Sequence, residues 1–380
     1  MTAYRRWSAA MAEALYGADG FYRRPDGPAA HFRTSVHASP LFAAAIRVLA
    51  EAVDASLGFP EPFDVVDVGA GDGELLAGLP GSGSVPPRWR LTAVEVRPRP
   101  AGLATGIGWL SEVPAGITGL VVANEWLDNV PLDVVEQTAD GPRVVLVGPA
   151  GTETLGEPPD QRDLDWLRRY WPLPEPGDRG ELGRSRDDAW AGTVGRLHRG
   201  VAVAIDYMHL PDNRPLGGTL TGFRAGVQVP PVPDGSCDLT AHVALDSCAD
   251  AGRLAAGAAG CARPVGRDCA AGSAPPVGPA GAASPAPVLL PQRAALRALG
   301  VTGGRPPLEL AAQDVAEYVR RLQRAGEGAE LLDPGGLGAF GWLVQPVGVG
   351  VPVELAAAAA TDVVLAGATA DADTADAEGR

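Results

Sequence analysis

Short runs of apolar residues recur along the first two-thirds of the chain, and longer segments with helical spacing separate them. Four runs are rich in Val, Ile and Ala and have the length of buried strands. They are Phe63–Val68, Arg90–Val96, Gly119–Asn124 and Val201–Tyr207. Hydrophobic strands joined by long crossovers are typical of a parallel sheet covered on both faces. The pattern therefore predicts an α/β fold with a doubly wound, mostly parallel sheet.

Helical patterns flank these strands. The clearest begins at Pro40 and ends before Gly58, since Pro favours the first turn of a helix and Gly the position after its end. Residues 1–60 as a whole are predicted to form an N-terminal helical segment. Further helices are expected at 160–171, 184–199, 293–299 and 312–325, and a last strand at Phe340–Gln345.

The composition changes after the predicted core, which we place at 61–248. From 249 to 290 the chain is rich in Ala, Gly and Pro and loses its periodicity, so a flexible insertion is expected. Residues 291–350 recover helical and strand patterns and are predicted to complete the domain. From 351 to 380 the chain is rich in Ala and then acidic, which predicts a disordered tail.

The 380 residues carry a formal charge of −15, and all 31 basic residues are arginine. Such an acidic chain is a poor nucleic-acid binder, because phosphate contacts need a surplus of basic side chains. We expect a cytoplasmic protein without membrane insertion, since neither an export signal nor a membrane-length apolar run is found. The four cysteines lack zinc spacing, so no metal is expected. The lack of lysine favours a GC-rich bacterial source, and nothing in the pattern specifies an oligomeric state.

The strongest local signal follows the first predicted strand. Asp67 precedes the turn Gly69-Ala70-Gly71-Asp72-Gly73, and a helical pattern begins directly afterwards. Glycines adopt positive φ and let a ligand approach the main chain, and the N–H groups of a helix start face such a ligand. Glu95 ends the next predicted strand, where doubly wound sheets hold an acid beside a ribose.

The spacing of the glycines separates two classes of cofactor. Dinucleotide folds use G-x-G-x-x-G, whereas here Gly69, Gly71 and Gly73 alternate. Asp72 would repel a pyrophosphate, but it suits a ligand that carries an ammonium and a sulfonium. The chemistry favours S-adenosylmethionine, with Asp67 near its ammonium group and Glu95 on its ribose hydroxyls. A nicotinamide or flavin fold, or a tight turn without a ligand, remains an alternative.

Several further stretches resemble motifs of one known family, in the same order. They are Tyr16–Tyr22, Phe32-Arg33-Thr34-Ser35, the glycine turn, Asn124-Glu125-Trp126-Leu127-Asp128, Asp206-Tyr207 and Asp238-Leu239-Thr240-Ala241-His242-Val243. On these residues, roughly 15–245, the chain resembles the MidA-type class I methyltransferases, which include the mitochondrial complex I assembly-factor methyltransferase. It departs from the family at His31, where an acid is usual, and at Met208, where glycine is usual.

The resemblance implies a Rossmann-like fold, S-adenosylmethionine as cofactor, and methyl transfer. The mitochondrial member is associated with arginine methylation on a complex I subunit, so the resemblance also implies a protein substrate and an arginine side chain. The candidate cofactor-binding residues are Asp67, Gly69, Ala70, Gly71, Gly73, Glu95, Asn124, Thr34 and Ser35.

The candidate catalytic residues lie near the carboxyl ends of two predicted strands. A protonated nitrogen must lose a proton when it accepts a methyl group, and a carboxylate can orient it and take that proton. Glu125 is the first candidate, Asp128 lies three residues on and on a similar face, and Asp206 ends a strand at the same edge. The alternative is local turn chemistry, with Asn124 and Asp128 as caps.

Two other functions are compatible with these patterns. A non-catalytic assembly factor or binding module would keep the fold and hold a basic partner on its acidic surface. A small-molecule methyltransferase would keep the cofactor site, but the long chain after Asp206 argues mildly against it, since that part could cover a macromolecule. The preferred interpretation is an S-adenosylmethionine-dependent methyltransferase that acts on a protein side chain.

Overall fold

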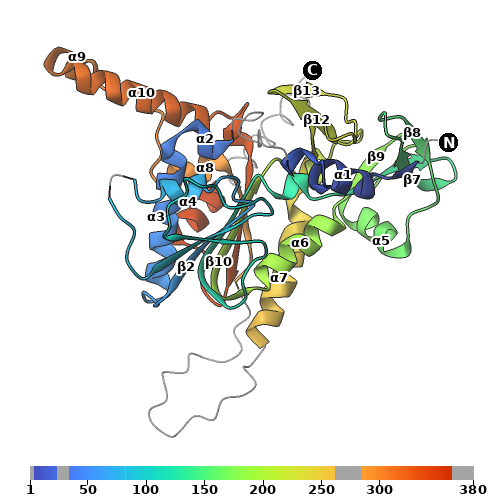
Figure 1. The fold of residues 1–380 in the computed structure, drawn as a ribbon, viewed down its shortest axis with the longest axis horizontal. Helices are drawn as coiled ribbons and strands as arrows, with labels where there is room; N and C mark the ends of the chain where they lie inside the picture. Colours follow the sequence, from blue (N-terminus) through green and yellow to red (C-terminus); the bar gives the residue numbers. More distant parts are fainter. Residues whose placement is uncertain (1–3, 24–33, 82, 262–284, 362–380) are drawn as a thin grey trace, which may run out of the picture.

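A central seven-stranded sheet organises the computed structural model, which describes residues 4–23, 34–81, 83–261 and 285–361 (Figure 1). Its strands, in spatial order, are β16 (Val288–Pro291), β17 (Gly341–Val347), β10 (Leu197–Asp206), β5 (Ile117–Asn124), β2 (Phe63–Val68), β3 (Trp89–Val94) and β4 (Ile107–Leu110). The pairs from β10 to β4 are parallel, and β17 is antiparallel to both neighbours. The four strands expected from apolar runs are β2, β3, β5 and β10, and the expected last strand is β17.

Helices cover both faces of this sheet, because alternate strand residues point to opposite sides. On one face Val65 and Leu120 pack with α3 (Pro40–Ser56) and α8 (Gln292–Ala298). On the other face Val66 and Val121 pack with α6 (Arg184–Val194) and α7 (Leu245–Cys261). The strands are apolar on both sides for this reason, as the sequence pattern indicated.

The prediction of one sheet was incomplete, because the described residues form three more sheets. One contains β1 (Arg5–Arg6), β6 (Asp133–Thr138), β7 (Gly141–Val147), β8 (Glu153–Leu155) and β9 (Arg179–Leu182); another contains β12 (Thr221–Arg224), β13 (Val227–Val229) and β14 (Asp238–Thr240); and β11 (Met208–His209) pairs with β15 (Val243–Ala244). These strands are short and partly exposed, so they lack the long apolar runs that revealed the central sheet.

Residues 1–60 do not form one helical unit. The first helix, α1 (Trp7–Tyr16), packs through Trp7 and Met11 on β6 and β7, far from the central sheet. Its successors are the short helices η1 (Phe21–Arg23) and α2 (Ser35–Ala38), and α3 then packs on the central sheet. The N-terminal part of the chain therefore contacts both the five-stranded sheet, through α1, and the central sheet, through α3. Residues 24–33 lie outside the described ranges.

The predicted flexible insertion at 249–290 is wrong at both of its ends. Helix α7 continues to Cys261, and β16 begins at Val288, while residues 262–284 lie outside the described ranges. The predicted tail is corrected in the same way. A helix spans 353–361 and buries Leu355 in the core, and 362–380 are not described. Alanine favours helices strongly, so an Ala-rich composition was a poor guide to disorder.

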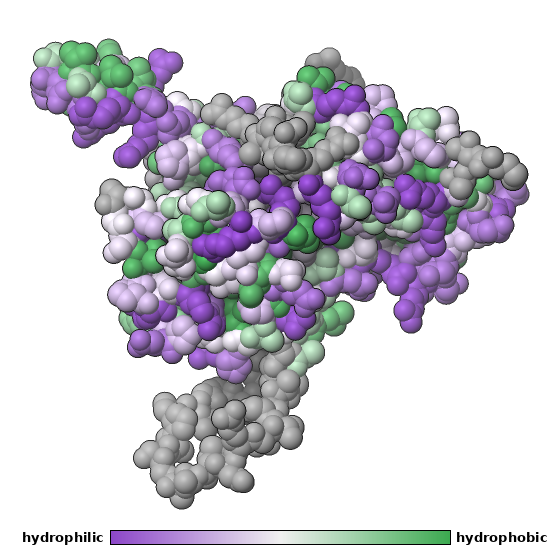
Figure 2. Space-filling view, viewed as in Figure 1, coloured by the Kyte–Doolittle hydropathy of each residue, from purple (hydrophilic) through white to green (hydrophobic). Residues whose placement is uncertain are grey.

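Two helices near the C-terminus, α9 (Leu308–Gln313) and α10 (Val315–Leu331), project from the body as an arm (Figure 1). Apolar and charged side chains both reach the surface of this arm (Figure 2), and Leu308, Val315 and Val319 are exposed. Helix α5 (Gln161–Tyr170) packs through Trp166 and Leu167 on β6 and β9 of the five-stranded sheet. No helix within the described ranges is both long and apolar enough to cross a bilayer.

Candidate active site

The glycine turn joins β2 to α4 (Glu74–Gly78) at the carboxyl edge of the central sheet. Gly69, Gly71 and Gly73 have φ values of +72°, +60° and +85°, which L side chains rarely adopt. A Cβ atom on Gly69 would also lie 2.8 Å from Cδ1 of Trp126. The turn therefore requires glycine both for its backbone and for the space beside Trp126.

Glu95 follows β3 and lies against this turn. Its Oε2 accepts a hydrogen bond from the Gly71 N–H at 3.1 Å, and its Oε1 accepts one from the Arg97 N–H at 3.1 Å. Each carboxylate oxygen can accept a second hydrogen bond. The side chain lines the cavity described below, as the predicted ribose contact requires.

Two aspartates flank the turn and differ in their surroundings. Burial raises the pKa of Asp67 to about 8, and the charges of Glu74 and Glu95 add to this effect. A cationic group bound nearby would favour its charged form. Asp72 instead pairs with Arg97 at 2.9 Å. Because Arg97 offsets its charge, the expected repulsion of a pyrophosphate by Asp72 is weaker than the sequence indicated.

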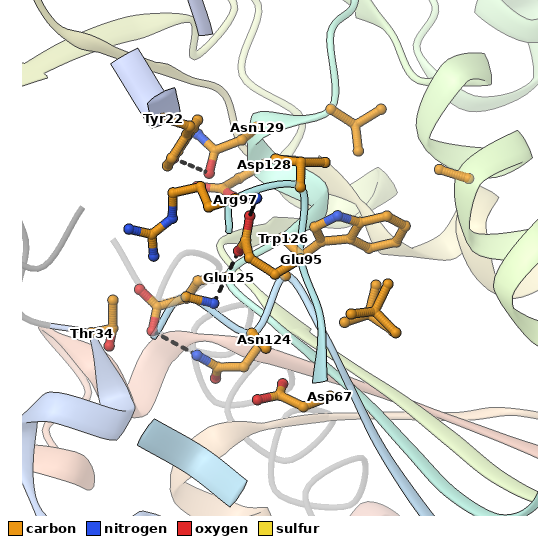
Figure 3. A pocket seen from close by; sticks show the side chains of 18 of the residues that line it. Tyr22, Thr34, Asp67, Glu95, Arg97, Asn124, Glu125, Trp126, Asp128 and Asn129 are labelled. Carbon is orange, nitrogen blue, oxygen red and sulfur yellow. Dashed lines mark hydrogen bonds between the residues drawn. The ribbon is translucent and has the colours of Figure 1, made fainter. Parts of the chain in front are cut away.

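Asn124 and Glu125 lie at the end of β5, the strand next to β2 (Figure 3). The Asn124 amide donates to Glu125 Oε1 at 3.1 Å, and the Ser35 N–H donates to the same oxygen at 2.9 Å. Burial raises the pKa of Glu125 to about 7; the Ser35 N–H hydrogen bond opposes this rise and the Asp128 charge contributes to it. The buried Oδ1 of Asn124 has no partner among the described residues, so it can still accept a hydrogen bond from a ligand.

Asp128 belongs to the 3₁₀ turn Leu127–Asn129 and Asp206 binds the backbone of that turn, so the two side chains have different roles. Asp206 is fully buried, and its Oδ2 accepts from the N–H groups of Leu127 and Asp128 at 2.9 and 3.2 Å. It does not line the cavity, so we correct its predicted catalytic role: it holds the 3₁₀ turn Leu127–Asn129 in place. Asp128 does line the cavity, and its Oδ1 has no described partner.

Thr34 and Ser35, the two predicted site residues from the N-terminal part of the chain, also have different surroundings. Thr34 lines the cavity and lies 2.7 Å from Nδ1 of His37. Ser35 is buried and lies outside the lining; its N–H holds Glu125, and its hydroxyl accepts from Gln292 at 3.2 Å. The predicted cofactor contact of Ser35 is therefore corrected to a positioning role. Phe32 and Arg33 lie outside the described ranges.

One cavity of about 910 Å³ brings these residues together (Figure 3). It extends from the glycine turn to a wall formed by residues of α1, η1, β12 and β14. Sequence reasoning did not select several of its lining residues as site residues. Four of them lie in the stretches that carry the family resemblance: Tyr16, Tyr22, Trp126 and Asp238. The others were not singled out by the sequence analysis; they include Arg97, Ser111, Glu112, Val113, Asn129, Asp188, Arg196 and Phe223.

A buried arginine, Arg186, which the sequence analysis did not select, holds backbone segments beside this cavity. The Arg186 guanidinium donates to the carbonyl oxygens of Asp128, Val130 and His242 at 2.5, 3.3 and 2.7 Å. It lies on α6 and is 2% exposed. Arg186 thus joins the turn after β5 to the chain segment after β14. Among the described residues, no cluster of side chains could hold a metal ion.

The contact of Glu95 with the turn leads to a test of its role. Replacing Glu95 with Ala is expected to weaken binding of S-adenosylhomocysteine at least about tenfold, the scale of lost hydrogen bonds to a charged group. Glu95→Gln should give an intermediate loss, since it keeps the shape and one acceptor. Calorimetric titration measures this, with the exposed Glu51→Ala on α3 as a control. Unchanged affinity would remove Glu95 from the cofactor site.

A second test concerns the pairing of α2 with α4, where His37 Nε2 lies 3.0 Å from Glu74 Oε1. The Glu74 hydrogen bond raises the pKa of His37. Burial acts to raise the pKa of Glu74, but hydrogen bonds from His37 and the backbone outweigh it and lower that pKa. Both groups are therefore charged between the ordinary pKa values of Glu and His, about 4.3 and 6.5.

His37→Ala should consequently lower the melting temperature near pH 6, and the difference should fade as pH rises through the raised pKa of His37. Thermal unfolding followed by circular dichroism at several pH values measures it. The exposed His198→Ala serves as the control. A difference that stays constant up to pH 9 would show that the ion pair does not hold α2 in place.

Comparisons with known proteins agree with this geometry. Residues 90–263 match a family model described as "Putative S-adenosyl-L-methionine-dependent methyltransferase". The match begins at β3, so it includes Glu95 and the residues after β5 but not the glycine turn. None of the curated proteins compared with this chain matches it.

Two crystal structures of proteins from Burkholderia thailandensis share the fold. One is described as a "likely methyl transferase" bound to S-adenosyl-homocysteine; it is 23% identical, with a TM-score of 0.68 over 93% of this chain and 90% of that one. The other, an uncharacterised protein of the same superfamily, is 22% identical, with a TM-score of 0.67 and the same coverage. This chain thus has the fold of these Burkholderia proteins, and its residues 90–263 are similar to the methyltransferase family.

Proposed function

We propose that this chain is an S-adenosylmethionine-dependent methyltransferase of the MidA type that acts on a protein side chain, an arginine by family resemblance. The observation that carries the proposal is the position of the cavity. It opens between the carboxyl ends of β2 and β5, where the strand order reverses direction. Ligands of open α/β sheets bind at such a point. The matching family model and the structure that holds S-adenosyl-homocysteine support the same cofactor.

The residues around the turn fit this cofactor. Gly69 and Gly71 leave room for a ligand against the main chain, and Glu95 offers carboxylate oxygens for a pair of ribose hydroxyls. Asp67 would face the ammonium group, and the unpartnered Oδ1 of Asn124 would accept a hydrogen bond from it. When bound, S-adenosylmethionine supplies a methyl group activated by a positively charged sulfur.

Glu125 is placed to act on the acceptor. Its Oε1 is held by Ser35 and Asn124, which fixes the carboxylate at the edge between the turn and the far wall (Figure 3). In methyl transfer the new nitrogen–carbon bond would replace the bond between the methyl carbon and the cofactor sulfur, with S-adenosylhomocysteine as the leaving group. The guanidinium nitrogen would then lose one proton, and Glu125 is the group that we expect to accept it. A pKa of about 7 suits that transfer at neutral pH.

The charge of the cavity favours a cationic acceptor. The side chains that line it include nine carboxylates and two arginines, and one of those arginines is already paired with Asp72. An excess of negative charge stabilises a guanidinium and disfavours an anionic substrate. We propose in addition that the substrate is a protein and that the reaction takes place in the cytoplasm of a bacterium.

Calorimetric titration with S-adenosylmethionine, S-adenosylhomocysteine and NADH tests the proposal most directly. Micromolar binding of the first two ligands, without binding of NADH, is the expected result. Binding of NADH alone would replace the proposal with a dehydrogenase. Cofactor binding without methyl transfer to any arginine peptide would favour the non-catalytic assembly factor.

A further inference from the structure

Two buried carboxylates occupy the part of the cavity that lies away from the glycine turn. Asp128 belongs to the turn after β5 and is 6% exposed, and Asp238 belongs to β14 and is 4% exposed. Both line the cavity. No cationic side chain of the described residues forms an ion pair with either carboxylate, and Arg186 contacts only the backbone oxygen of Asp128. The charge of Arg186 acts to lower the pKa of Asp128 but does not outweigh burial, so a bound cation would still stabilise the charged forms of both carboxylates.

The hydrogen bonds around the pair leave one position unfilled. Asp238 Oδ1 accepts from the Tyr22 hydroxyl at 3.0 Å and from the Asn129 amide at 3.1 Å. Asp128 Oδ2 accepts from the Thr240 hydroxyl at 2.7 Å. Asp128 Oδ1 is buried without any described partner. An unpartnered buried carboxylate oxygen is costly, and a donor from a ligand would remove that cost.

Hydrogen bonds link the two carboxylates through their sequence neighbours, because Asn129, next to Asp128, donates to Asp238, and Thr240, two residues after Asp238, donates to Asp128. Burial raises the pKa of Asp238 to about 7, and the charge of Asp128 adds to this. Burial also raises the pKa of Asp128. A cation between them would stabilise both charged forms.

Aromatic rings complete this end of the cavity. Tyr16 and Tyr22 stack with ring centroids 5.5 Å apart, and Tyr207 and Phe223 also line the space. Tyr22 and Asn129 lie across the cavity from Asp67, which marks the cofactor side (Figure 3). Aromatic faces attract cations, and planar guanidinium groups stack on them.

We propose that Asp128 and Asp238 bind the cationic group of the acceptor side chain, a guanidinium, and that Asp238 determines the preference for this cation over a neutral group of the same shape. Tyr22 positions Asp238 through its hydroxyl. This inference rests on the proposed function and adds the residues that select the acceptor. Glu125 remains the group nearer the cofactor, while the Asp128–Asp238 pair holds the acceptor from the opposite side.

The test compares N-acetyl-arginine amide with N-acetyl-citrulline amide, which has the same shape without the charge. Both are titrated into the full-length protein in the presence of saturating S-adenosylhomocysteine. Wild-type protein is expected to bind the arginine probe at least about tenfold more tightly, as for a hydrogen-bonded charge. Asp238→Asn should remove most of this preference, and Tyr22→Phe should reduce it by a smaller factor. Asp165→Asn, on the exposed face of α5, is the matched control and should keep the full preference.

Binding of S-adenosylhomocysteine is measured for each variant, so that loss of the fold is recognised. If Asp238→Asn does not fold, the wild-type comparison and Tyr22→Phe still decide the question. Equal binding of the two probes by wild-type protein that binds S-adenosylhomocysteine would overturn this inference and leave the proposed cofactor intact. A folded Asp238→Asn protein that keeps the full preference would overturn it as well. Failure of wild-type protein to bind S-adenosylhomocysteine would instead overturn the proposed function.

Discussion

Replacing Glu125 with Gln is expected to slow methyl transfer about 100-fold, the scale of a lost general base. The amide keeps the size of the side chain and can still interact with the Ser35 N–H, but it cannot accept a proton. Cofactor binding should change little, because we propose Glu95 and the glycine turn as its contacts. The rate is measured as transfer of labelled methyl from S-adenosylmethionine to an array of arginine peptides.

The pH dependence separates a proton acceptor from a residue that only shapes the cavity. Burial raises the pKa of Glu125 to about 7. A base must be ionised to act, so kcat/KM should rise as pH increases through about 7. In Glu125→Gln that rise should disappear. Glu51→Gln, on the surface of α3, is the control. A fully active Gln variant with an unchanged pH profile would exclude Glu125 as the acceptor of the proton.

Replacing Gly69 with Ala is expected to weaken S-adenosylhomocysteine binding about 100-fold, which corresponds to about 2.7 kcal/mol. The new Cβ would meet Trp126 Cδ1 at 2.8 Å, at a φ of +72°. Trp126 lines the cavity, so the clash is relieved by moving either the turn or the indole from its place in the site. Calorimetric titration measures the loss of affinity, and thermal unfolding measures the change in stability.

Gly58→Ala is the matched control, because Gly58 has a φ of +78° but open space around its Cβ position. Both variants carry the cost of a left-handed backbone for an L residue, roughly 1–2 kcal/mol. Only Gly69→Ala should lose cofactor affinity. Equal affinities of the two variants would mean that the turn does not contact the cofactor.

The parallel strands and the glycine turn could be predicted because their signals are local. The run Phe63–Val68 is apolar on both faces, as in a buried parallel strand, and the three alternating glycines after it allow the positive φ values of a tight strand-to-helix turn. Glu95 followed from the same rule, since the carboxyl ends of parallel strands meet at one edge. These elements place the turn, Asn124 and Glu125 together without any knowledge of loop structure.

Two site assignments failed because the sequence does not show whether a side chain at the sheet edge faces the cavity or the protein interior. Asp206 and Asp128 both end or follow a strand at the catalytic edge, and only packing shows that Asp206 points at the backbone of the turn after Leu127. Ser35 was predicted to contact the cofactor, but it lies outside the cavity lining and its backbone N–H donates to Glu125. The Ala-rich segments were predicted to be flexible, yet α7 and the helix over 353–361 are regular, because alanine packs well in helices.

The sequence by itself determined the central α/β sheet, the glycine turn at its carboxyl edge, and the acids that follow β3 and β5. Periodicity and strand direction depend on neighbouring residues, so they can be derived from the order of the chain. The tertiary structure decided which carboxylates reach the cavity and what lies opposite them. Tyr22 meets Asp238 across 216 positions of the sequence. No local pattern encodes such a contact, because it forms only when α1 and η1 pack against β14 in the folded chain.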